Sequence, residues 1–311
     1  AQNGRRGALM ITLDVNHPDI EEFIHCKQDL KNITGANISV KLSDEFMRSV
    51  ESDSDFTLKF PTNSDAPIMT KVVKAKELWR KIVTCARNTA EPGLIFWDRQ
   101  HYYSTSSVYP FYKNVSTNPC AEIAMGGNDS CRLIAINFFS FIKNCFTTDA
   151  YLDEEKVYEI CYEAQRLADD LVDLELEYVT KIIKKIESDP EPDFIKEAEL
   201  RTWKELYRTG KEGRRTGTGF TGLADMVAAM NFNYDSDDGI KLIEKVMRIK
   251  CQAEFDASVD MSIIRGPFIG FNPAIEDTSE FVQMLKSEFN ELYTRMMSYG
   301  RRNVSLSTVA P

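Results

Sequence analysis

The sequence predicts an α/β protein in which parallel strands alternate with helices. Short apolar runs typical of buried strands recur along the chain, and segments with helical apolar spacing separate them. This alternation favours parallel sheets, because a return to a parallel strand needs a crossover connection, usually a helix. We expect strands at residues 8–13, 34–40, 94–97, 132–138 and 303–309.

The helices are predicted from their apolar stripes and start signals. His17-Pro18-Asp19 places a proline in the first turn of one helix, and Ser43-Asp44-Glu45 opens the next. A polar excursion follows over residues 51–72. Further helices are expected at 74–89, 154–187, 195–208, 219–231, 237–259 and 279–297.

The longest predicted helix, residues 154–187, ends at the proline-bearing sequence Asp189-Pro190-Glu191-Pro192. Its apolar residues recur at helical spacing and are expected to form one buried stripe. The stripe consists of Val157, Ile160, Cys161, Ala164, Leu167, Ala168, Leu171, Leu174, Val179, Ile182 and Ile186.

Composition and charge limit the class of protein. The 38 basic and 48 acidic residues give a net charge of -10, which argues against a nucleic-acid-coating protein, since that function needs a basic face. No apolar run reaches the eighteen or so residues of a membrane helix, and no leader sequence is visible. We therefore expect neither a membrane nor a nucleic-acid partner. A polyphosphate ligand remains possible, because a few arginines suffice for it.

The seven cysteines are odd in number and scattered, which predicts a reducing cytoplasm rather than a disulfide framework. The three histidines, His17, His25 and His101, form no cluster with metal-ligand spacing. We therefore expect no protein-bound metal.

Residues 116–131 contain the most informative chemistry. Asn118, Cys120 and Glu122 are two residues apart, so in an extended segment an amide, a thiol and a carboxylate would share one face. Pro119 lacks a backbone N–H and suits a loop or a sheet edge. The pattern predicts a thiol at a loop tip with a carboxylate beside it.

A second cysteine, Cys131, follows Cys120 after eleven residues, past the turn sequence Gly126-Gly127-Asn128-Asp129. The second thiol is therefore within folding-back distance. A free cysteine is commonly a small buried apolar residue, but Glu122 would be a poor neighbour for Cys120 in an apolar core. This favours a functional thiol.

The sequence Gly217-Thr218-Gly219-Phe220-Thr221-Gly222 fits the pattern G-x-G-x-x-G. A dinucleotide site needs a strand directly before this pattern, and the preceding residues 211–215 are too polar to form a buried strand. We interpret the glycines as a closely packed helix entrance rather than an NAD site.

The 116–131 stretch resembles the finger loop of the ribonucleotide reductase catalytic subunit, whose pattern Asn-x-Cys-x-Glu is matched by Asn118, Cys120 and Glu122. Five further blocks resemble the family in the same order, so the similarity runs from end to end. These blocks are residues 4–24, 34–48, 92–98, 214–226 and 299–311.

The resemblance implies the central part of a ten-stranded α/β barrel with an internal finger loop carrying the active-site cysteine. Residues 1–311 would then form a partial catalytic barrel domain, and the family's partner cysteine and phosphate loop are expected outside them. Within this domain the resemblance implies a specificity loop at 1–7, the finger loop and redox cysteine at 116–131, and a mainly helical section at 154–260.

The resemblance also implies roles for individual residues. Cys120 would carry a transient thiyl radical that abstracts the 3′-hydrogen of a ribonucleotide. Glu122 would act as general base on the 3′-hydroxyl, and Asn118 would hold ribose hydroxyls. Cys131 would be half of the dithiol that supplies two electrons and ends as a disulfide. For Asn118, a turn-forming role before proline remains an alternative.

Gln2, Arg5 and Arg6 fall in what resembles the specificity loop, which links an effector nucleotide to the substrate base; a solvated polar turn is the alternative. The Cys120–Cys131 spacing and the sequence of residues 132–137 resemble the adenosylcobalamin-dependent branch of the family. The implied partners are a ribonucleotide diphosphate or triphosphate substrate, a nucleotide effector, a thioredoxin-type reductant, and complementing chain segments or a homodimer.

Two other functions stay open from the sequence. One is a non-catalytic barrel fragment that binds nucleotide or complements another chain. The other is a glycyl-radical enzyme, which shares the barrel and the thiyl radical but needs a glycine-radical motif that is not visible in residues 1–311.

Overall fold

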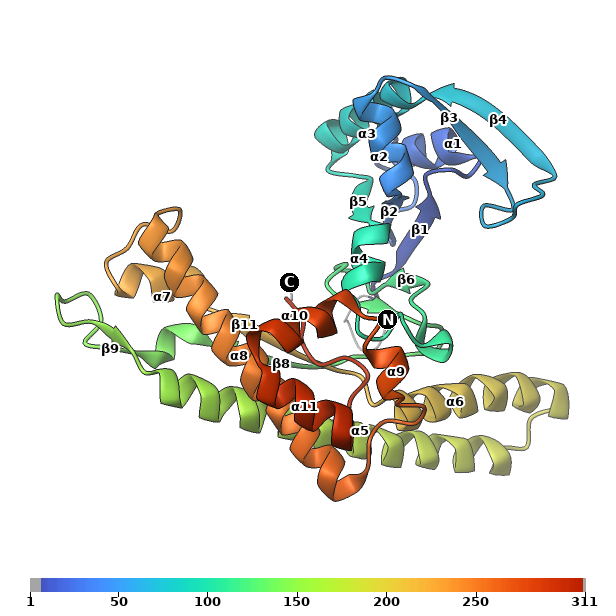
Figure 1. Ribbon diagram of the computed structural model, residues 1–311. Helices are drawn as coiled ribbons and strands as arrows, with labels where there is room; N and C mark the ends of the chain where they lie inside the picture. Colours follow the sequence, from blue (N-terminus) through green and yellow to red (C-terminus); the bar gives the residue numbers. More distant parts are fainter. Residues whose placement is uncertain (1–6, 310–311) are drawn as a thin grey trace. The chain divides into compact units, whose positions relative to one another are not determined.

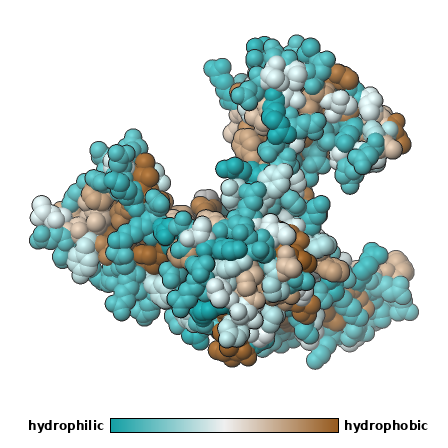
Figure 2. Space-filling model, viewed as in Figure 1, coloured by the Kyte–Doolittle hydropathy of each residue, from teal (hydrophilic) through white to brown (hydrophobic). Residues whose placement is uncertain are grey.

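The computed structural model describes residues 7–309, which belong to two compact units (Figure 1). The first unit comprises Ala1–Tyr103 and Val115–Ala124, and the second comprises Ser104–Asn114 and Met125–Pro311. Gln2, Arg5 and Arg6 lie outside the described residues. None of the helices within residues 7–309 is both long and apolar enough to cross a membrane. Hydrophilic residues cover most of the face seen in Figure 2, with smaller apolar patches between them.

The first unit is built on a parallel three-stranded sheet with the strand order β1-β2-β5. Side chains alternate between the two faces of a strand. On β2, Ile38, Val40 and Leu42 are at most 2% exposed, so this face forms core. The sheet confirms the parallel strands predicted in this part of the sequence. Its strands are β1 (Met10–Asp14), β2 (Asn37–Leu42) and β5 (Gly93–Phe96).

Three helices complete the core of this unit. Ser43 begins the second of them, and its side chain accepts a hydrogen bond from the Phe46 backbone N–H at 3.2 Å. Leu78 and Ile82 of the third helix are buried, as their predicted stripe requires. The helices are α1 (Ile20–His25), α2 (Asp44–Glu51) and α3 (Ala75–Thr89), and the short α4 (Trp97–Tyr103) follows β5 directly.

The expected polar excursion at residues 51–72 is instead largely a β-hairpin. Strands β3 (Asp55–Phe60) and β4 (Met69–Lys74) pair antiparallel. Phe56 and Leu58 are buried between polar neighbours, at 4% and 0% exposure. This alternation is the period-two pattern of a strand, but it spans too few residues to be recognised within a largely polar sequence.

The second unit contains a parallel pair of strands, β8 (Arg132–Asn137) and β11 (Thr216–Thr221). The segment near Ser307 runs beside β11. The Thr218 backbone N–H donates to Leu306 O at 2.9 Å, and Thr218 and Ser307 form a parallel β-bridge. The strand predicted at 132–138 is confirmed. The strand predicted at 303–309 is reduced to this bridge.

The glycine-rich sequence is therefore a buried strand and not a helix entrance. Helix α7 (Leu223–Ala229) begins after it, so the helix predicted at 219–231 starts four residues late. At position 219 a Cβ would lie 3.3 Å from Cγ2 of Thr308, a tight contact that glycine avoids. The first two glycines sit inside β11 and not in a turn after a strand, which excludes the dinucleotide-loop geometry.

Long helices pack against this pair of strands. The helix predicted at 154–187 is confirmed as α5 (Glu154–Ser188), and Ile136, Phe138 and Val157 belong to the core it forms with α8. The helix predicted at 279–297 is two helices, separated at Phe289. The remaining helices are α6 (Asp193–Gly213), α8 (Asp237–Arg265), α9 (Pro273–Glu276), α10 (Glu280–Glu288) and α11 (Asn290–Tyr299).

Short elements connect these parts. Strands β9 and β10 form an antiparallel pair, so strand pairing is mixed and not parallel throughout. Over residues 7–309 the strands form separate sheets of two or three strands and no closed barrel. The short elements are β6 (Ser116–Thr117), β7 (Ala124–Met125), β9 (Ile142–Lys143), β10 (Tyr151–Leu152) and the 3-10 helices η1 (Pro110–Tyr112) and η2 (Phe138–Phe141).

Candidate active site

The segment that carries Cys120 lies over the second face of the β1-β2-β5 sheet. Thr12 Oγ1 is 3.1 Å from Ser116 Oγ, and Asn37 Nδ2 donates to Pro119 O at 2.8 Å. Asn37 alternates with the buried Ile38, so it points away from the helix-covered core. One face of the sheet therefore packs on helices, and the opposite polar face supports the cysteine-bearing segment.

Residues 118–123 form a turn between β6 and β7. The Ala121 backbone N–H donates to Asn118 O at 3.0 Å, and the Ile123 backbone N–H donates to Asn118 Oδ1 at 3.2 Å. Ala121 has a positive φ of 65°. The expected extended segment, with residues 118, 120 and 122 on one face, was therefore wrong. The Asn118 side chain competes for backbone donors, as asparagine commonly does in turns.

The three predicted residues all lie in this turn, with different exposure. Cys120 is exposed at the tip, Asn118 and Glu122 are half-buried, and Ile123 is 5% exposed and anchors the turn. Asn118 Oδ1 stabilises the turn, while its Nδ2 makes no hydrogen bond to any other described residue between 7 and 309. The thiol is thus presented at a loop tip, with an amide donor and a carboxylate within two residues of it.

A cavity of about 510 Å³ lies beside this turn. Its size falls within the range of small-molecule pockets, roughly 300–1,000 Å³. Ala121 contributes to its wall, and Arg99 and Gln100 supply polar groups. The other lining residues are Leu94, Ile95, Phe96 and Tyr103.

Cys131 lies in the second unit, directly before β8. Its neighbour Arg132 donates to Glu175 Oε2 at 2.5 Å. Two residues before it, Asp129 pairs with Arg215 at 2.6 Å, and these two side chains are 3% and 1% exposed. The predicted Gly126–Asp129 turn thus ends in a fixed segment that carries the half-buried Cys131.

The other cysteines have the environments expected of packing residues. Cys85 and Cys161 are buried, while Cys26, Cys145 and Cys251 are half-buried. Burial raises the pKa of the Cys161 thiol to about 12, and it does the same for the pKa of Cys251. Thiols held in the protonated form are poor nucleophiles.

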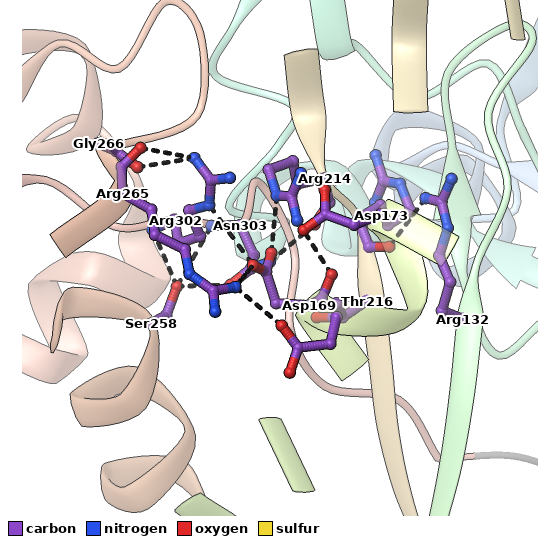
Figure 3. A network of polar contacts seen from close by, with 12 residues as sticks. Arg132, Asp169, Asp173, Arg214, Thr216, Ser258, Arg265, Gly266, Arg302 and Asn303 are labelled. Carbon is purple, nitrogen blue, oxygen red and sulfur yellow. Dashed lines mark hydrogen bonds and ion pairs between the residues drawn. The ribbon is translucent and has the colours of Figure 1, made fainter. Parts of the chain in front are cut away.

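A buried polar network in the second unit was not predicted from the sequence (Figure 3). Asp169 of α5 is fully buried and accepts hydrogen bonds from Arg214 Nε at 2.7 Å and Asn303 Nδ2 at 2.8 Å. Arg302 Nε and Arg265 each lie 3.5 Å from its second oxygen. The only sequence signals were adjacent arginines at 214–215 and 301–302 and acids at helical spacing on α5.

The acids of this network are spaced closely enough to suggest a cation site, since Asp169, Asp170 and Asp173 could bring their oxygens together. Arginines already pair with all three: Arg214 with Asp169 and Asp173, and Arg265 with Asp170. These contacts make the cluster an anchor between helices. They join α5 to the start of β11 and to the end of α8.

A second cavity, of about 570 Å³, adjoins this network. Asp173 and Glu177 balance part of the charge of the cationic side chains that line it. Because Arg214 and Arg265 are committed to ion pairs, the cavity does not offer a cluster of uncommitted cations to an anion. The cationic lining residues are Lys211, Arg214, Arg265 and Arg302.

The sequence model of the ribonucleotide reductase barrel domain matches residues 1–311. The chain belongs to the ribonucleotide reductase family. It is 29% identical over 309 residues to a vitamin B12-dependent ribonucleoside-diphosphate reductase of Mycobacterium tuberculosis, with 99% of the chain and 37% of the relative aligned. The reductase of the same description from Thermoplasma acidophilum is 30% identical over 269 residues, 85% of the chain and 30% of the relative.

A vitamin B12-dependent ribonucleotide reductase of Streptomyces clavuligerus is 26% identical over 294 residues, which cover 86% of the chain and 27% of that reductase. The chain thus spans about a third of the length of the reductases it matches. The recognised resemblance to ribonucleotide reductase, and to its cobalamin-dependent members, is confirmed at the level of family.

Vitamin B12 dependence in these reductases raises the question of where a corrinoid would fit. The cavity beside the turn, at about 510 Å³, has the volume of a small-molecule pocket, and its lining residues point to no particular cofactor. The exposed Cys120 thiol is accessible from outside the turn. We therefore assign none of the described residues to holding adenosylcobalamin.

Proposed function

We propose that this reductase chain is the catalytic barrel portion of an enzyme that reduces ribonucleotides to 2′-deoxyribonucleotides through a thiyl radical on Cys120. The observation that carries the proposal is the exposed Cys120 thiol at the tip of a turn over the polar sheet face, beside a nucleotide-sized cavity. Family membership supports the reaction class independently.

The proposed chemistry uses the residues of the turn. The Cys120 thiyl takes the 3′-hydrogen of the ribose, which forms S–H and leaves a carbon radical. Glu122 takes the proton of the 3′-hydroxyl while the 2′ C–O bond breaks, and the 2′-hydroxyl leaves as water with a proton from one of the two thiols of the dithiol; Glu122 returns its proton to the 3′-oxygen when the sugar is reduced. Cys131 and a second thiol supply two electrons and two protons and become a disulfide. Cys120 then returns its hydrogen to C3′ and is again a thiyl radical.

Asn118 is proposed to bind the substrate. Its Oδ1 is committed to the turn, so Nδ2 is the group that would donate to a ribose hydroxyl. This combines the two roles considered for this residue, since the turn fixes the amide that binds the sugar. Gln2, Arg5 and Arg6 keep their proposed role in the effector loop.

The fold proposal is that both parallel sheets are parts of the family's ten-stranded barrel, with residues 116–131 as its internal finger loop. Within residues 7–309 no named strand pairs with the outer edges of β1, β5 or β8, which favours this, because parallel strands normally have both faces and both edges covered. Complementing chain segments or a second copy would supply the covering strands.

Cofactor and partners follow from the same proposal. The names of the relatives support adenosylcobalamin, which when bound would supply the radical that starts the reaction. A thioredoxin-type reductant would regenerate the dithiol, and a nucleotide effector would select the substrate. A cytoplasmic location provides the reducing conditions that a dithiol requires.

The test is deoxyribonucleotide formation by the chain joined to the flanking segments found in its relatives, with adenosylcobalamin and a dithiol. We expect Glu122→Gln to lower turnover by about 10²- to 10⁴-fold, the usual contribution of a general base, with substrate affinity in calorimetry little changed. Nucleotide binding without any product from the wild-type protein would reject the enzyme and leave a nucleotide-binding barrel fragment.

A further inference from the structure

Cys131 lies between two side chains that bind the same carboxylate. Ser130 Oγ donates to Glu175 Oε1 at 2.9 Å, and Arg132 Nε donates to Glu175 Oε2 at 2.5 Å. Arg132 also donates through Nη1 to the backbone oxygens of Ser130 and Arg215, both at 3.1 Å. One residue of α5 therefore holds the chain immediately before and after the cysteine.

The segment is held upstream as well. Asp129 is paired with Arg215, which adjoins β11, and both side chains are almost fully buried. Residues 129–132 are thus fastened to α5 on one side and to the start of β11 on the other. Glu175 is the accessible member of this arrangement, with 37% of its side chain exposed.

These contacts decide the direction of the thiol. Side chains two residues apart on an extended segment point the same way, so Ser130 and Arg132 both point toward α5. Cys131 then points to the opposite side, which Leu133 shares. Leu133 is 53% exposed, so this side of the strand is not covered by the helices of the unit.

We propose that Glu175 is a positioning residue for Cys131: by binding both neighbouring side chains, its carboxylate keeps the thiol on the uncovered side of β8. The inference rests on the proposed function for its purpose, because Cys131 is the thiol assigned there to the electron-supplying dithiol. A redox thiol must meet both a substrate and a second thiol, and a rotated segment would turn it into the helix interface. Glu175 does not touch reacting atoms in this account.

The test is the rate at which iodoacetamide alkylates each cysteine of the chain at fixed pH, measured by peptide mass spectrometry. In Glu175→Ala we expect Cys131 to react about tenfold more slowly, because loss of a charged hydrogen bond allows the segment to rotate and turn the thiol into the helix interface. Glu175→Gln keeps an acceptor for Arg132 and a donor for Ser130, so its Cys131 rate should stay within about threefold of wild type. The matched control is Glu177→Ala, two residues along the same helix.

Two other cysteines serve as internal references. The exposed Cys120 and the buried Cys161 should keep their wild-type rates in Glu175→Ala, since a merely structural role would change them together with Cys131. Unchanged or faster alkylation of Cys131, or an equal fall at Cys120, would overturn the positioning role. If Glu175→Ala fails to fold, Ser130→Ala removes one of the two bonds; about a threefold fall in the Cys131 rate supports the proposal and no fall overturns it.

This readout needs neither substrate nor radical. A chain without reductase activity could still show the Glu175 dependence, in which case the proposed function fails and the orientation of Cys131 stands. An active reductase in which the alkylation rate of Cys131 does not depend on Glu175 would support the proposed function and reject the positioning role.

Discussion

Asp169 and Arg214 form a buried ion pair, with Nε 2.7 Å from Oδ1 and side chains 0% and 4% exposed. Removing one member of such a pair leaves an unpaired charge in the interior, which lowers stability by about 3–5 kcal/mol. We therefore expect Asp169→Ala to lower the free energy of unfolding by this amount in urea denaturation. Asp170→Ala, which removes a 57% exposed partner of Arg265, should cost less than about 1 kcal/mol. Equal losses in the two variants would contradict the anchoring role.

A second buried pair, Lys250 and Glu254, joins α8 to β11 and to Ser307 beside it. Lys250 Nζ lies 2.6 Å from Glu254 Oε1 and donates to Thr218 O at 2.9 Å. Lys250→Met should destabilise the protein by about 3–5 kcal/mol, since it leaves the carboxylate uncompensated. The double variant Lys250→Met with Glu254→Leu should recover much of that loss in the same unfolding assay. Additive losses would show that the two charges are not coupled.

Glu21 should make the first unit sensitive to acid. The hydrogen bond from Lys81, at 2.6 Å, lowers the pKa of Glu21 from its ordinary value of 4.5; burial opposes this shift, and the charges of Lys81 and Lys71 add to it. A lowered pKa gives stability that is present above the unfolded value and lost as the pH falls through the folded value. The stability difference between wild type and Glu21→Gln should be full above about pH 5 and shrink below about pH 4.

The matched control for this pH dependence is Glu22→Gln, which alters the exposed neighbouring acid. Urea denaturation at a series of pH values measures both variants against wild type. A Glu21→Gln difference that stays constant from pH 7 to pH 3 would show that the contacts with Lys81 and Lys71 do not stabilise the folded state.

Gly222 begins α7 with a positive φ of 68°, and a Cβ there would collide with Asn137 Oδ1. Both effects disfavour a side chain, so Gly222→Ala should cost about 1–3 kcal/mol in thermal or urea unfolding. Gly127→Ala is the control, because no heavy atom lies within 4 Å of its Cβ position. A harmless Gly222→Ala would mean that the start of α7 adapts to a side chain.

The sequence predicted the elements whose signals are local and long. Helices α3 and α5 follow continuous apolar stripes, and the strands of the first sheet are short apolar runs. The α5 stripe was right in position but wrong in detail: Leu167 and Leu174 are 55% and 50% exposed, while Gln165 and Asp169 are buried. Gln165 and Asp169 can be buried because Thr216 and Arg214, which lie on other elements, form hydrogen bonds with them.

The candidate site was predictable as a set of residues but not as a shape. Asn118, Cys120 and Glu122 were recognised from their spacing, whereas the turn depends on a positive φ at Ala121 and on Asn118 accepting a backbone N–H. Glu175 could not be predicted, because its contact with Ser130 joins residues 45 positions apart. β11 was missed because glycine is uncommon inside strands. The reason for glycine at position 219 is the close approach of Thr308, which is distant in the sequence.

The most direct test of the central claim is deoxyribonucleotide formation by Cys120→Ser in the chain joined to its flanking segments. A serine hydroxyl keeps the size and hydrogen bonding of the thiol but cannot carry a comparable radical, so product should fall to background while nucleotide binding persists. Cys145→Ser, at a half-buried cysteine with no assigned role, should keep wild-type activity. Product formation at the wild-type rate by Cys120→Ser would contradict the assignment of the radical thiol.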